Sequence, residues 1–212
     1  MSEWGPLAAL AGTWEGNEGL DLSFHNADAE VGETGYLEKV DLKPFGPVDN
    51  GKQCLYGLDY RMAAWRHGEE DQNPFHTEVG YWLWDAADRQ VMRCFMIPRA
   101  TVLIAGATCE PDAKQFTLRA DPGEPCYGIL ENRYLGANAS TRHYECTVSV
   151  HDDGSWSYVQ DTMLMTDPSD YDACNREYVK HFPNGLPARH TVRFGVPTEA
   201  KVAFSCIALA GD

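Results

Sequence analysis

Apolar and polar residues alternate along most of the chain, and the helical period of 3.6 residues is nearly absent. Because successive side chains of a strand point to opposite faces, this alternation predicts β-strands. Clusters of Gly, Pro, Asn and Asp separate the alternating runs, as expected for turns. One short helical turn is expected at Leu7–Leu10, ahead of the first strand. The predicted strands are Gly12–Glu15, Leu20–His25, Tyr36–Lys43, Gln53–Arg66, Phe75–Asp85, Gln90–Ile97, Thr101–Glu110, Gln115–Ala120, Ile129–Leu135, Arg142–His151, Trp156–Thr166, Ala188–Gly195 and Val202–Ile207.

Short turns join several of these strands, at Asp85–Asp88, Glu110–Ala113 and Asp152–Gly154. Consecutive hairpins build a meander, and a meander of about ten strands closes on itself because closure removes its exposed edges. The predicted fold class is therefore all-β: an up-and-down antiparallel β-barrel of the lipocalin type. We expect a single domain over residues 1–212, with an irregular loop or lid at 167–187.

The strand Phe75–Asp85 carries a mixed face, with His76 and Glu78 followed by Trp82 and Trp84. Polar groups among large rings predict a pocket that holds polar side chains rather than a dry interior. Two alternatives stay open. The two Trp rings cap a barrel end or lie under a loop, or His76 and Glu78 form an exposed cross-strand pair.

Charge and cysteine content narrow the expected partners and location. The net charge is −15, from 32 acidic and 17 basic residues, which argues against nucleic acid or a membrane surface as a partner. Seven Cys without a C-x-x-C pair indicate neither a disulfide framework nor a zinc site. The N-terminal segment has no basic region followed by a long apolar stretch, and no run approaches a membrane span of about 20 residues. We expect a cytoplasmic protein.

Two segments carry candidate ligand-binding residues. Gly12, Trp14 and Gly16 open the first strands, where the Trp ring is expected to enter the barrel base and close it. His190 follows the irregular loop, and a neutral imidazole is a natural axial ligand for haem iron, although a lone strand His also serves as a structural residue. No nucleophile elbow, P-loop or dinucleotide fingerprint is present, so no catalytic residue is assigned.

Two motifs in this order resemble the nitrobindin family of haem-binding β-barrels, which are related in shape to fatty-acid-binding proteins and lipocalins. The first is the N-terminal Gly-x-Trp-x-Gly-x-Gly motif, matched by Gly12, Trp14 and Gly16, with Glu18 in place of the last Gly. The second is Pro-x-His-x-Glu-x-Gly-Tyr, matched by Pro74, His76, Glu78, Gly80 and Tyr81.

The resemblance implies haem b as cofactor, bound by a His near the C-terminus that serves as the metal ligand. By its order along the chain His190 resembles that residue, with His181 as the competing candidate, while His76 would lie at the haem edge. Gly12, Trp14 and Gly16 would contribute to the cofactor site. The implied activity is binding of nitric oxide and isomerisation of peroxynitrite to nitrate through ferric haem.

Other functions fit the same motifs. A barrel without haem would bind or carry an apolar small molecule, as fatty-acid-binding proteins do, and the features of Gly12–Gly16 suit it equally well. A barrel without any ligand would serve as an interaction module that uses the loop at 167–187. The expected partner is haem or a small hydrophobic ligand, and the sequence leaves a homodimer open.

Overall fold

The computed structural model describes residues 3–25, 30–165 and 202–203. Strands dominate this part of the chain, which confirms the all-β class. The elements are η1 (Gly5–Leu10), β1 (Gly12–His25), β2 (Glu30–Asp49), β3 (Cys54–Arg66), β4 (His76–Asp85), β5 (Gln90–Ile97), β6 (Thr101–Thr108), β7 (Gln115–Pro122), β8 (Gly128–Glu131), α1 (Arg133–Asn138), β9 (Ser140–Val150), β10 (Trp156–Met165) and β11 (Val202–Ala203). The 3₁₀ helix η1 confirms the helical turn predicted before the first strand.

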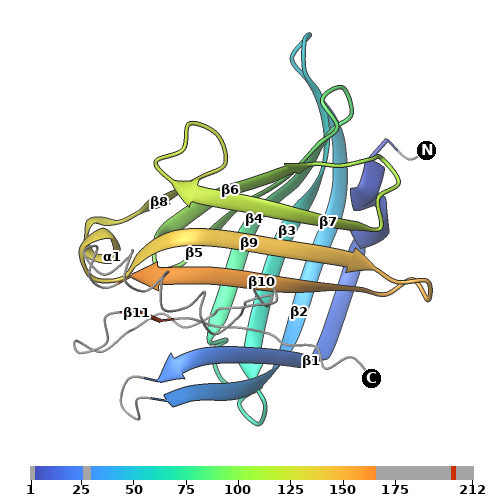
Figure 1. Ribbon diagram of the computed structural model, residues 1–212. Coiled ribbons are helices and arrows are strands. Elements are labelled where there is room, and N and C mark those ends of the chain that lie inside the picture. Colours follow the sequence, from blue (N-terminus) through green and yellow to red (C-terminus); the bar gives the residue numbers. More distant parts are fainter. Residues whose placement is uncertain (1–2, 26–29, 166–201, 204–212) are drawn as a thin grey trace, which may run out of the picture.

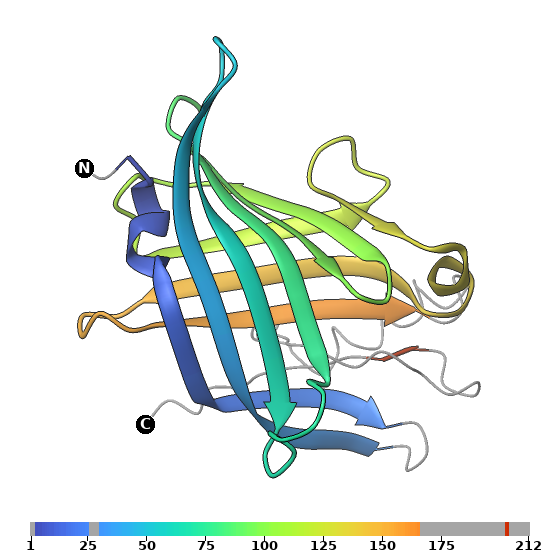
Figure 2. The same ribbon diagram turned by 180° about the vertical axis from the view of Figure 1, so that it is seen from behind.

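All the described strands belong to one sheet in the order β1-β2-β3-β4-β5-β6-β8-β7-β9-β10-β11. The sheet curls round so that β1 comes to face β10, as expected for a barrel (Figures 1 and 2). Neighbours pair antiparallel except β7 and β8, which run parallel. The up-and-down prediction therefore holds from β1 to β6, and it is broken only where β8 inserts between β6 and β7.

The predicted strand Ile129–Leu135 is wrong in its second half. Strand β8 ends at Glu131, and the helix α1 starts at Arg133. The side chain of Asn132 accepts a hydrogen bond from the backbone N–H of Leu135 at 3.0 Å, which caps the first turn of the helix. This local cap outweighs the apolar alternation that favoured a longer strand.

The first two predicted strands, Gly12–Glu15 and Leu20–His25, form one strand, β1. Its pairing with β2 shifts between Gly16 and Gly19, and this irregularity explains why the alternation stops there. Strand β2 is also much longer than predicted, because it runs through Pro44 and Pro47. Both prolines lie near the end of the ladder, where the pairing of β2 with β3 is itself irregular.

The barrel interior follows the alternation of β4. His76, Glu78, Trp82 and Trp84 are buried, whereas Tyr81 on the opposite face is 50% exposed. The mixed face predicted for this strand therefore points inward. Trp84 lies against η1, where a Cβ on Gly5 would be only 2.5 Å from Cε2 of the Trp84 ring.

The end of the barrel is covered by η1 rather than by Trp14. Leu7 and Leu10 of this helix are completely buried in the core. Trp14 remains half-buried, and its indole N–H donates to the Leu10 carbonyl at 2.8 Å. Trp14, expected to close the barrel base, packs against the same core without being fully buried.

The loop or lid predicted at 167–187, the strand at 188–195 and most of the strand at 202–207 lie outside the described residues. Of this region the structure describes Val202 and Ala203, which pair with Met165 and Leu164 of β10. The single domain over 1–212 accordingly stays a prediction. Among the described residues, no helix is long and apolar enough to cross a membrane.

Candidate functional site

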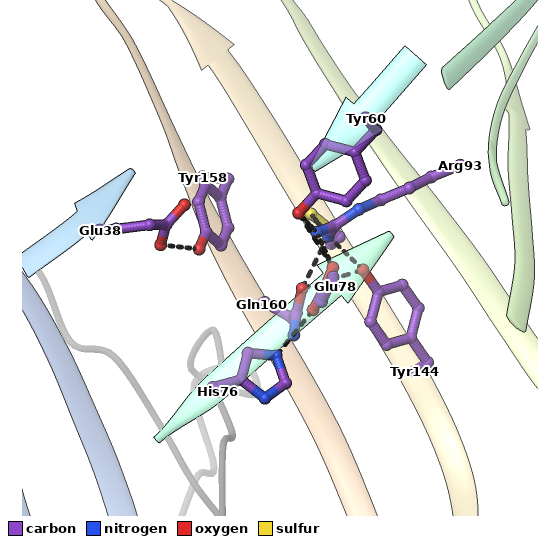
Figure 3. Close-up of polar contacts among 9 residues, drawn as sticks. Glu38, Tyr60, His76, Glu78, Arg93, Tyr144, Tyr158 and Gln160 are labelled. Atoms are coloured by element: carbon purple, nitrogen blue, oxygen red, sulfur yellow. Dashed lines mark hydrogen bonds and ion pairs between the residues drawn. The ribbon is translucent and has the colours of Figure 1, made fainter. Parts of the chain in front are cut away.

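An ion pair lies in the middle of the barrel interior. Arg93 of β5 and Glu78 of β4 are 2% and 1% exposed, and Arg93 Nη2 lies 2.6 Å from Glu78 Oε2 (Figure 3). The pair forms because both side chains point inward from adjacent antiparallel strands. The guanidinium also lies over aromatic rings, 4.6 Å from the ring centre of Phe95 and 5.1 Å from that of Trp82.

Four further side chains accept hydrogen bonds from Arg93, of which the Cys146 sulfur is the most distant at 3.5 Å. Its Nη2 donates to the Tyr60 hydroxyl at 2.7 Å, and its Nη1 donates to Gln160 Oε1 at 2.7 Å and to the Tyr144 hydroxyl at 2.5 Å (Figure 3). These partners come from strands β3, β10 and β9. The guanidinium of Arg93 therefore connects five strands of the sheet through its ion pair and hydrogen bonds. A buried charge needs such partners, since leaving it unpaired is costly.

His76 belongs to the same cluster. Its Nε2 lies 3.0 Å from Glu78 Oε1. Burial alone would raise the pKa of Glu78, but Arg93 and then His76 overcome it and lower that pKa to about 2. Glu78 is therefore ionised, and an ionised carboxylate only accepts, so the His76 ring donates from Nε2. The exposed cross-strand pair considered for His76 and Glu78 is excluded, and the two residues form a polar cluster in the interior, outside the described lining of the pocket.

A pocket of about 590 Å³ opens where β1 faces β10. Its size is within the range of about 300–1,000 Å³ that ligand sites occupy. Large rings form much of its wall, and within this wall Trp14 and Trp156 pack edge to face with ring centres 6.2 Å apart. The residues of its lining that the structure describes are Trp14, Glu15, Gly16, Asn17, Glu18, Gly19, Leu20, Tyr36, Glu38, Val40, Ser155, Trp156, Ser157, Tyr158 and Val159.

Glu38 is the buried acid of this pocket. It is 8% exposed, and the Tyr158 hydroxyl donates to its Oε2 at 2.5 Å (Figure 3). Burial raises the pKa of Glu38 to about 7, against the opposing effect of the Tyr158 hydrogen bond. Burial also raises the pKa values of the Tyr36 and Tyr158 phenols, so both keep their protons near neutral pH. Glu38 is thus the group of the described lining whose charge changes near neutral pH.

The residues predicted as a cofactor site separate into three places. Trp14 and Gly16 line the pocket. Gly12 lies just beyond it, with a φ of 143° that favours glycine, next to the Trp14 ring. His76 is outside the lining and bonded to Glu78 in the interior. His190, predicted as the metal ligand, and its competitor His181 lie outside the described residues.

Sequence reasoning missed Arg93, Glu38 and the tyrosines that bond to them. Arg93 left a signal, because it is the one charged residue in the otherwise uncharged predicted strand Gln90–Ile97, and it falls on the face shared by Val91 and Phe95. The sequence carries no such signal for Glu38, since its neighbour Lys39 is equally polar and the strand contains several other charged residues.

The pocket fits a flat macrocycle in size and in its aromatic walls. No His or Cys is present in its described lining, so an axial ligand for iron has to come from another part of the chain. Throughout the described residues no cluster of three or more His, Cys, Asp or Glu is placed to hold a metal ion. The described walls can therefore hold a porphyrin plane but do not by themselves coordinate its iron.

Comparisons with known proteins place this geometry in a family. A search of curated proteins finds no match. The crystal structure of Rv2717c from M. tuberculosis is similar, with a TM-score of 0.53 at 16% sequence identity, covering 79% of this chain and 91% of that chain. At this identity the likeness shows the fold alone. The model of the THAP4-like, heme-binding beta-barrel domain matches residues 3–174, most of the chain. The chain therefore belongs to the family of THAP4-like, heme-binding β-barrel domains.

Proposed function

We propose that the chain binds haem b in the pocket between β1 and β10. The observation that carries this proposal is the pocket of about 590 Å³ with walls formed by Trp14, Tyr36 and Trp156. The pocket lies in a domain whose family is described as heme-binding. Flat aromatic walls suit a porphyrin plane because offset and edge-to-face ring contacts add to the apolar area that binding buries.

The axial ligand in this proposal is His190, with His181 as the alternative. The sequence places both after the last residue of the family match, which ends at 174, so the assignment relies on their order along the chain. The described lining contributes no imidazole that would compete for the iron.

The chain's own residues would orient the cofactor and keep its surroundings fixed. Trp14 and Trp156 would contact the macrocycle, while Glu38 and Tyr158 form the polar part of the wall. Haem held by one protein ligand supplies an open coordination position, at which nitric oxide would bind and peroxynitrite would isomerise to nitrate. The cluster around Arg93 would hold the barrel wall rigid behind the site.

A haemin titration of the purified apoprotein tests this function. We expect a sharp Soret band with one equivalent of haemin in the wild type, and loss or a marked shift of the band in His190→Ala. His67→Ala removes an exposed imidazole outside the pocket lining and is the matched control, which should leave the band unchanged. An unchanged band in His190→Ala with a lost band in His181→Ala transfers the ligand role to His181. Absence of any Soret change in the wild type would refute haem binding.

The second candidate is an apolar small molecule without iron. It is favoured by Leu20, Val40 and Val159 in the same lining, together with the lack of a described imidazole there. A pure interaction module has less support, because a barrel without a ligand should be filled by its own side chains. The described side chains fill the interior around Arg93, but they do not fill the pocket between β1 and β10.

We also propose a reducing compartment such as the cytoplasm. The support is that the five cysteines described, Cys54, Cys94, Cys109, Cys126 and Cys146, are all free thiols. Thiol titration of the denatured protein purified without reductant should therefore find all seven cysteines of the sequence reactive. A lower count, restored by reductant, would contradict the proposal.

A further inference from the structure

The charges around the pocket have a single sign. Glu15, Glu18 and Glu38 are in the lining, and none of the described lining residues is Lys, Arg or His. Lys39 bonds Glu15 at 3.2 Å from outside the pocket, with more than half of its side chain exposed to solvent. Arg93 is buried and already paired with Glu78. A ligand in this pocket therefore meets carboxylates without a free cation among the described residues.

Glu38 differs from the other two acids in its depth. Its exposed fraction is 8%, whereas Glu15 and Glu18 are exposed at the rim. A carboxylate has about four acceptor positions. Among the described residues, Tyr158 provides the hydrogen bond that Glu38 accepts, so most of this acceptor capacity remains for a bound molecule.

The groups that face Glu38 come from four strands. Tyr158 of β10 donates to it and favours its anion. Glu78 of β4 opposes the anion, while Arg93 of β5 and His76 of β4 favour it. Burial has the largest effect and favours the neutral acid. On β2 itself the next inward ring is Tyr36, which stays neutral.

The balance of these effects brings the pKa of Glu38 to about 7. Below this pH the acid both donates and accepts a hydrogen bond, and above it the carboxylate only accepts. On β1, the buried Asp21 lies within electrostatic range of Tyr36 and adds another acidic group to this side of the barrel. Arg93 and His76, whose charges favour the Glu38 anion, are not in the described lining, and both already contact Glu78.

We propose that Glu38 is the specificity-determining residue of this pocket. Its carboxylate accepts a hydrogen bond from an N–H or O–H of a planar aromatic ligand, and it repels ligand carboxylates from the inner end of the pocket, where Glu38 is buried. The inference relies on the proposed function only in taking the space between β1 and β10 as the ligand site. For haem it sets the orientation. Glu38 would keep the propionates away from the inner end, so that they would face solvent.

Three naphthalene probes of equal size test this selection in the apoprotein at pH 8. They are 1-naphthylmethylamine, 1-naphthylmethanol and 1-naphthoate, and calorimetry measures their Kd values. We expect the wild type to bind the amine 10- to 100-fold more tightly than the carboxylate, with the alcohol in between. Glu38→Gln should reduce this difference to less than about threefold, because the amide keeps an acceptor but loses the charge. Glu110→Gln removes a surface carboxylate outside the pocket and should keep the preference.

A second measurement needs no variant. In the wild type the preference for the amine over the carboxylate should grow at least threefold between pH 6 and pH 8, as Glu38 loses its proton. Equal binding of amine and carboxylate at pH 8, a preference that survives in Glu38→Gln, or no binding of any probe would each overturn the proposal. The haemin titration separates the two claims. A missing Soret band with intact charge preference contradicts the haem proposal alone, and a Soret band without charge preference contradicts this one alone.

Discussion

The ion pair between Arg93 and Glu78 provides the sharpest test of how this barrel is held together. We predict that Arg93→Met strongly destabilises the fold, because it leaves an ionised Glu78 in the interior with an exposed fraction of 1%. Methionine retains the apolar stem of Arg93 but loses the guanidinium, with its ion pair to Glu78 and its contacts over the Phe95 and Trp82 rings, so the loss is mainly electrostatic.

The expected magnitude follows from the burial of both partners. Removing one member of a buried ion pair costs about 3–5 kcal/mol, since the remaining charge has lost its partner. Domains are stable by only about 5–15 kcal/mol, so this is a large share of the total. For a chain of 212 residues each kcal/mol shifts the Tm by about 2–4 °C, which predicts a fall of about 6–20 °C.

Urea unfolding followed by tryptophan emission measures the change. The matched control is Arg89→Met, which removes the same charge from an exposed pair with Glu110. Exposed pairs contribute about 0–1 kcal/mol, so the control should stay within 1 kcal/mol of the wild type. Adding Glu78→Gln to Arg93→Met should recover at least about 1 kcal/mol, because the uncompensated anion is then gone. The reasoning is refuted if Arg93→Met costs no more than Arg89→Met.

Three further predictions concern other parts of the fold. Between pH 4.5 and about 7, the free energy of unfolding of Glu38→Gln should rise by about 3 kcal/mol relative to that of the wild type. The reason is that Glu38 in the folded wild type keeps a proton that it loses in the unfolded chain, so the wild type is destabilised as pH rises. A difference in the free energy of unfolding that does not change with pH contradicts the raised pKa of Glu38. Gly80→Ala should prevent normal pairing of β4 with β5 and lower the free energy of unfolding by several kcal/mol, since the added Cβ would lie 2.0 Å from the Cys94 carbonyl oxygen. A Tm of the variant within about 2 °C of the wild-type Tm would contradict this close approach. Asn132→Ala should cost about 1 kcal/mol through loss of the cap on α1, measured by urea unfolding, and a neutral result would show that the cap does not hold the helix.

Much of the fold could be predicted from the sequence because it depends on local alternation. The bounds of β5 match the prediction at both ends, and the inward face of β4 is the one that carries His76 and Trp84. The prediction failed where a single side chain decides the structure, as at Asn132. It also failed to find the insertion of β8 between β6 and β7, since strand order depends on contacts between segments far apart in the chain.

The candidate site could be predicted only in part. The motif residues Trp14 and Gly16 do line the pocket, because β1 forms its edge. The pairing of His76 with Glu78 also follows from their spacing on one face of a strand. The position of Arg93 beside Glu78 depends on the register between β4 and β5, and that of Glu38 beside Tyr158 depends on how far the sheet curls. Neither of these two contacts can be predicted from the local alternation of polar and apolar residues.

The central claim is that the pocket between β1 and β10 holds the haem. A crystal structure of the protein grown with haemin tests it most directly, with the iron located by its anomalous scattering. The account predicts an iron peak inside the pocket lined by Trp14, Tyr36 and Trp156, with the macrocycle against these rings. An iron peak elsewhere, for instance at the exposed His67 or His151, would contradict it.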